Sequence, residues 1–143
     1  MNEDSIQLIK EVDSGCLMAI NSLHQMEEYE MPKEQNDMIT RYIAKHDELQ
    51  KEASRMLHNN NETDKQPGMM VSAMSWLTTE MKLMLHENTS EISKIIMNGC
   101  NMGIQSIREQ MTKYKAASEE AVKLAEKLIK LEEDMFSDAK EFI

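Results

Sequence analysis

The chain has 143 residues, enough for one domain with a substantial buried core. Its 26 acidic and 16 basic side chains give a net charge of −10, which opposes binding to nucleic-acid phosphates or anionic lipid. No apolar run approaches the roughly 20 residues that span a membrane, and the acidic start, residues 1–4, is unlike a signal peptide. We therefore expect a cytoplasmic protein that binds neither nucleic acid nor membrane and keeps its cysteines reduced.

The spacing of apolar residues predicts an all-α fold. Apolar side chains in steps of three and four indicate a first helix over about residues 5–28. Pro32 suits the first turn of a second helix, which fades into the polar run 59–64. Pro67 and Gly68 then mark the clearest predicted loop.

A third helical segment is predicted from a stripe of apolar residues. These are Met70, Met74, Leu77, Met81 and Met84. Asn88 followed by Glu91 matches a capping box, which predicts a further helix from there to Tyr114. A single helix over residues 69–114 is the alternative. The last helix is predicted to carry the apolar stripe from Ala121 to Phe142.

An internal repeat predicts how these helices are connected. Residues 15–23 reappear 84 positions later as residues 99–107, with Gly, Cys, Met, Ile and Ser identical at matched positions. Such a repeat is typical of two related halves, and the short connections within each half predict two antiparallel hairpins. Two hairpins joined by one long crossover form a ferritin-like, up-down four-helix bundle. We expect one such domain over residues 1–143, with a helical crossover.

The chain resembles small bacterial ferritin-like proteins, which are four-helix-bundle families of unknown function. The resemblance is carried by Gly68 with Trp76, by residues 90–96, 98–104 and 124–128, and by Glu132 with Glu133. It covers the whole chain and implies a ferritin-like fold with a distant relation to di-iron carboxylate proteins. Those proteins place their metals in the middle layer of the bundle.

A layer of polar residues is the candidate metal site. Counting from the first turn puts Asp13 and His46 at one height, and the second hairpin brings Glu132 and Glu133 to the same level. A di-iron site needs Glu-x-x-His on each of two helices. Here Ile43 precedes His46 by three positions, and the last helix has no histidine. We expect a degenerate site in which Asp13 and His46 form a buried polar pair. The alternative is an atypical iron or manganese site that also uses Glu132 or Glu133.

The repeat also suggests a soft-metal alternative. Cys16 and Met18 recur as Cys100 and Met102, and thiolate and thioether ligands suit Cu(I). The favoured interpretation is that these cysteines and methionines fill the core, because methionine adapts to irregular gaps. No cofactor is therefore expected.

Small residues recur at a spacing of four on both repeat helices: Gly15 with Ala19, and Gly99 with Gly103. Glycine costs a helix roughly 1 kcal/mol relative to alanine, so its use indicates a close approach. We expect the two repeat helices to cross closely there. The alternative is that the missing side chains open a pocket for a ligand.

The favoured function is therefore that of a non-enzymatic structural or interaction module with a degenerate metal site. The alternatives are a metal-binding protein, a metal-dependent oxidase or storage protein, and a carrier of an apolar ligand. Trp76 and Leu83 lie off the apolar stripe of the crossover, so we expect exposed apolar surface there. Symmetric dimers commonly cover such surface, which predicts a homodimer.

Overall fold

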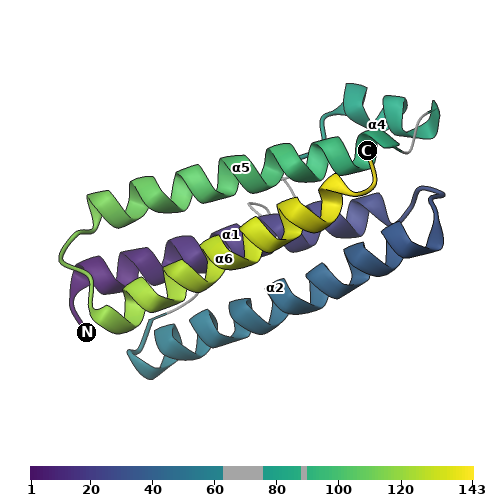
Figure 1. The fold of residues 1–143 in the computed structure, drawn as a ribbon. Helices are drawn as coiled ribbons and strands as arrows, with labels where there is room; N and C mark the ends of the chain where they lie inside the picture. Colours follow the sequence, from purple (N-terminus) through teal and green to yellow (C-terminus); the bar gives the residue numbers. More distant parts are fainter. Residues whose placement is uncertain (63–75, 88–89) are drawn as a thin grey trace.

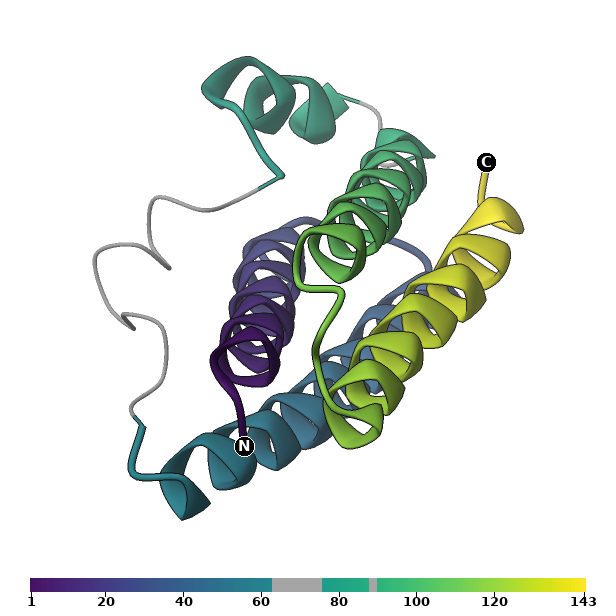
Figure 2. The same ribbon diagram turned by 90° about the vertical axis from the view of Figure 1, so that its left-hand side faces the viewer.

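The structure, a computed structural model, describes residues 1–62, 76–87 and 90–143. These residues form five helices and no strand, so the predicted all-α class is confirmed. The helices are α1 (Glu3–Met26), α2 (Lys33–Asn59), α4 (Thr79–Glu87), α5 (Ser90–Lys113) and α6 (Glu119–Lys140). The four long helices, α1, α2, α5 and α6, lie side by side, and the short α4 stands beside the start of α5 (Figures 1 and 2).

The long helices pair as two antiparallel hairpins, α1 with α2 and α5 with α6 (Figure 1). Helix α1 begins where Asn2 Oδ1 accepts the backbone N–H of Ser5 at 2.9 Å. Pro32 directly precedes α2, where its missing N–H leaves no helical hydrogen bond unmade. Ser118 caps α6 in the same way as Asn2 caps α1, because its hydroxyl accepts the N–H of Ala121. Local capping chemistry thus sets the helix starts.

The buried faces of the long helices form two apolar clusters. One joins the first half of α1 to the second half of α2 and the start of α6, and it includes Ile9 and Leu57. The other joins the end of α1 to the start of α2 and the end of α6, and it includes Leu23 and Met135. Along α2 and α6 the positions between the two clusters hold His46 and Glu132, both buried. A polar layer therefore separates two apolar halves of the core.

The chain between the hairpins differs from the prediction. Met70, Met74 and Asn88 lie outside the described residues. Residues 76–78 are not helical, and α4 begins only at Thr79. Neither a helix running through the whole methionine stripe nor a single helix over residues 69–114 is therefore present.

Hydrogen bonds explain why the helix starts late. The backbone N–H of Trp76 donates to Ser22 Oγ on α1 at 2.9 Å. Thr78 Oγ1 accepts the N–H of Met81 at 3.2 Å, as an N-terminal cap does. Trp76 is thus attached to α1 before α4 begins.

The buried face of α4 is also shifted from the predicted stripe. Leu85 is fully buried and Met81 partly buried, whereas Met84 is 52% exposed. The prediction placed Met84 on the inner face and was wrong: the buried positions follow Leu77 and Met81 in steps of four and so reach Leu85, which points about 100° away from Met84. Leu83 is 66% exposed, in keeping with the expected apolar surface.

Candidate functional site

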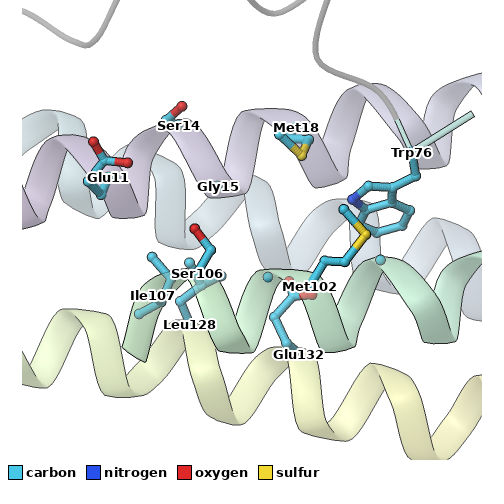
Figure 3. A pocket seen from close by; sticks show the side chains of 12 residues that line it. Glu11, Ser14, Gly15, Met18, Trp76, Met102, Ser106, Ile107, Leu128 and Glu132 are labelled. Carbon is cyan, nitrogen blue, oxygen red and sulfur yellow. The ribbon is translucent and has the colours of Figure 1, made fainter. Parts of the chain in front are cut away.

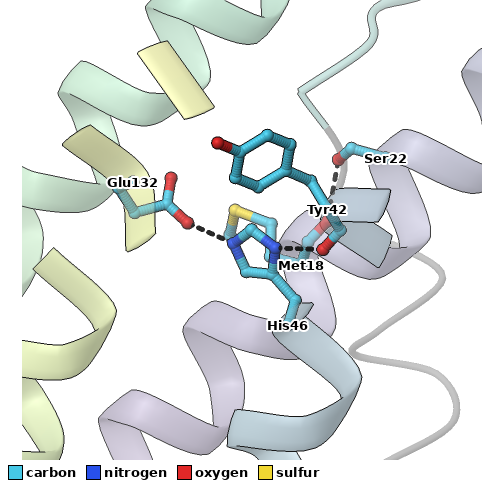
Figure 4. Close-up of polar contacts among 5 residues, drawn as sticks. All are labelled: Met18, Ser22, Tyr42, His46 and Glu132. Atoms are coloured by element: carbon cyan, nitrogen blue, oxygen red, sulfur yellow. Dashed lines mark hydrogen bonds and ion pairs between the residues drawn. The ribbon is translucent and has the colours of Figure 1, made fainter. Parts of the chain in front are cut away.

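His46 of α2 and Glu132 of α6 form a pair in the polar layer (Figure 4). The distance between Nε2 and Oε1 is 2.5 Å, and the two residues are 0% and 3% exposed. Nδ1 donates to the Tyr42 carbonyl oxygen at 2.7 Å, so that nitrogen carries a proton, because a carbonyl only accepts. Nε2 and Oε1 therefore share one proton. Whether the pair is imidazolium with carboxylate or imidazole with carboxylic acid, its net charge is zero.

Asp13 is buried as predicted, but His46 is not its hydrogen-bonding partner. Asp13 Oδ1 accepts from Gln50 Nε2 at 2.8 Å, and Gln50 lies one turn beyond His46 on α2. Both ring nitrogens of His46 are engaged by Tyr42 and Glu132. The predicted Asp13–His46 pair is therefore wrong: His46 points to α6, and Asp13 Oδ1 is bonded by a glutamine.

The residues of the alternative metal site, which are Asp13, His46, Glu132 and Glu133, do not all point to one place. Glu132 faces His46, whereas the adjacent Glu133 is exposed, because neighbouring positions on a helix point about 100° apart. Among the residues that the structure describes, no group of three or more His, Cys, Asp or Glu side chains could hold a metal ion. The structure brings together only part of the predicted set.

The two cysteines are buried free thiols on either side of the polar layer. Burial raises the pKa of Cys16 well above its ordinary 9.0, and the charges of Glu132 and Asp13 raise it further. Burial also raises the pKa of Cys100, aided by the charge of Glu132 and by the hydrogen bond that the thiol donates to it. Both thiols are therefore protonated at neutral pH.

The repeated methionines do not complete a soft-metal site with these thiols. Met102 is 64% exposed, and Met18 is partly buried at the edge of a cavity. Copper(I) is bound by thiolate rather than thiol, and this environment disfavours the thiolate. Core packing is the role that the structure gives to both cysteines.

That cavity lies between α1 and α5, above α6, and has a volume of about 190 Å³ (Figure 3). Trp76 lies at one end, and Ile107 of α5 with Leu128 of α6 lies toward the other. Glu132 contributes to the wall between them, on the side opposite α1. The lining is mostly apolar, with a few polar groups from α1, α5 and α6.

Three glycines line this cavity, and the position of an added Cβ shows which side chain each of them faces. At Gly99 it would lie 2.4 Å from Trp76 Cδ2, and at Gly15 it would lie 3.2 Å from Leu128 Cδ2. At Gly103 the nearest atom would be Glu132 Oε2, at 3.4 Å. None of these neighbours belongs to the opposite repeat helix.

The expected close crossing of α1 and α5 therefore needs correction at the glycines. Gly99 admits the indole of Trp76, and Gly15 and Gly103 border the cavity. Ala19 is fully buried. The alternative prediction, that the missing side chains open a pocket, agrees better with the positions of the glycines.

Sequence reasoning missed two partners in this region. Gln50 was not recognised as the partner of Asp13, although it lies one helical turn from His46. Trp76 was assigned to exposed surface, yet its indole lies against Gly99. The sequence did contain a signal for this contact: the chain has one tryptophan, and glycines on the repeat helices leave room for a large ring.

Searches against protein-family models, curated proteins and solved structures find no match to this chain. Among the described helices, none combines the length and apolarity needed to cross a bilayer.

Proposed function

We propose that this chain is a non-enzymatic interaction module that holds a small, largely apolar ligand between α1 and α5. The cavity of about 190 Å³ carries this proposal. An apolar cavity of about 150 Å³ binds benzene in another helical protein, so this space suits a single ring with a short substituent. A mostly apolar lining with few polar groups is also typical of small-molecule sites.

The polar layer supports binding rather than catalysis. His46 is fully buried and uses both ring nitrogens within the protein, so it has no nitrogen to offer a substrate. Cys16 and Cys100 are protonated and buried, which makes them poor nucleophiles. These three candidates for acid–base or nucleophilic chemistry are thus engaged or protonated.

The arrangement favours a ferritin-like bundle with a degenerate metal layer. We also propose that the protein is cytoplasmic, as expected from its sequence. Its support is the pair of hairpins, the internal repeat and a polar layer at mid-height. Elemental analysis of protein purified without chelators tests the degenerate layer. Stoichiometric iron, manganese or copper that is lost in His46→Leu but kept in His58→Leu would contradict it, since His58 is exposed.

Ligand binding is tested by titrating the protein with toluene and following the fluorescence of Trp76, the sole tryptophan. Saturable binding is expected in the natural chain. Gly103→Leu should abolish it, because the side chain fills the cavity, whereas Gln105→Leu adds leucine at an exposed position of the same helix. Equal toluene binding in both variants would contradict the proposed site.

Self-association is a second proposal, and the exposed face of α4 favours it. Leu83 and Met84 are adjacent and exposed, and monomers seldom leave large apolar patches uncovered. We expect sedimentation at micromolar concentration to show a homodimer that Leu83→Lys dissociates. A 16.6 kDa species for the unmodified chain would contradict this proposal.

A further inference from the structure

We propose that the ligand is a small organic cation, an amine on an apolar body, and that Glu132 Oε2 receives its ammonium group. This inference rests on the proposed binding function and adds the chemical class of the ligand. It follows from the charge of the lining, the orientation of Glu132 and the position of Trp76.

The titratable groups that line the cavity are carboxyl groups. Among the described residues of the lining, these are Glu11 and Glu132, and none is Lys, Arg or His. Glu132 belongs to the neutral pair with His46, so the net charge of the lining comes from Glu11. An anionic ligand would be repelled by Glu11 and would meet acceptor oxygens at Glu132, whereas a cation would be attracted by both.

Glu132 presents a hydrogen-bond acceptor to the cavity. Its Oε1 bonds His46, while Oε2 lies on the side of Gly103, 3.4 Å from where a Cβ would be. If the shared proton resides on His46, the ion pair points its negative end at the cavity. If it resides on Oε1, Oε2 is the carbonyl oxygen of a carboxylic acid. Oε2 accepts a hydrogen bond in both cases, so the ligand that fits here is a donor.

Trp76 adds a second attraction for a cation. Gly99 faces the indole and Gly103 faces the carboxyl group, and these glycines are one helical turn apart on α5. The ring and Oε2 are therefore neighbours along the cavity. A cation within about 6 Å of an indole face is attracted by its π electrons. The apolar body then extends toward Ile107 and Leu128 (Figure 3).

Three probes of nearly equal size test the charge: benzylamine, benzyl alcohol and benzoate, each titrated at neutral pH and followed by Trp76 fluorescence. Benzylamine should bind about tenfold more tightly than benzyl alcohol, because a charged donor makes the stronger hydrogen bond. Benzoate should bind more weakly than either. This comparison uses the unmodified chain and needs no variant.

The role of Glu132 is tested by Glu132→Leu, with Glu133→Leu as the matched control. Both substitutions remove a carboxyl group and its acceptor oxygens at adjacent positions, but Glu133 is exposed. Glu132→Leu should bring benzylamine binding to within about twofold of benzyl alcohol binding, while Glu133→Leu keeps a preference of about tenfold. Circular dichroism establishes that each variant is folded.

The outcomes separate this inference from the proposed function. Equal binding of benzylamine and benzyl alcohol, or tighter binding of benzoate, would overturn the cationic ligand and leave the cavity as a binding site. A preference for benzylamine that survives in folded Glu132→Leu would overturn the role of Glu132. No binding of toluene or of any of the three probes would overturn the proposed function itself.

Discussion

Two alanine substitutions one turn apart on α5 should have opposite effects on stability. Replacing Gly103 or Gly99 by alanine relieves the same helical penalty, roughly 1 kcal/mol. At Gly103 the added methyl group meets Glu132 Oε2 at 3.4 Å, an ordinary contact. Gly103→Ala should therefore raise the free energy of unfolding by up to about 1 kcal/mol.

At Gly99 the added methyl group would overlap the indole of Trp76. It would lie 2.4, 2.5 and 2.9 Å from three ring carbons, so the ring or the helix has to shift. Overpacking of this kind costs about 1–3 kcal/mol, which exceeds or cancels the helical gain. We expect Gly99→Ala to lower the free energy of unfolding by about 0–2 kcal/mol.

Urea unfolding followed by circular dichroism compares the two variants with the natural chain, and Trp76 emission reports on the indole. Gly99→Ala should shift the emission to longer wavelength, because the displaced ring meets more water, whereas Gly103→Ala should leave it nearly unchanged. Equal stabilisation by both substitutions, with unchanged emission, would refute the packing of Trp76 on Gly99.

Two further predictions concern the polar layer. His46→Leu should lower the free energy of unfolding by about 3–5 kcal/mol, because it leaves the buried Glu132 carboxyl group without that partner. The double variant with Glu132→Leu should recover much of that loss in urea unfolding, and purely additive losses would contradict the pairing. The raised pKa values of Cys16 and Cys100 mean that the unfolded chain releases its thiol protons first, so stability should fall as the pH rises above 9.0. Each thiol contributes a slope of about 1.4 kcal/mol per pH unit, and urea unfolding between about pH 8 and 10 should show a shallower decline when both cysteines are replaced by alanine.

The sequence by itself determined where most of the helices lie. The caps at Asn2 and Ser118, Pro32 and the three-and-four spacing of apolar residues act over one or two turns, so neighbouring residues contain the information. The all-α class and the burial of His46 follow from the same local pattern.

Only the tertiary structure decided which side chains meet. Asp13 and His46 were correctly placed inside, but their partners, Gln50 and Glu132, depend on how each helix is rotated about its axis. One residue along a helix turns a side chain by about 100°, which is why Glu132 reaches the core and Glu133 the solvent. The cavity likewise depends on where Trp76 comes to rest against Gly99, a contact between elements that no local pattern records.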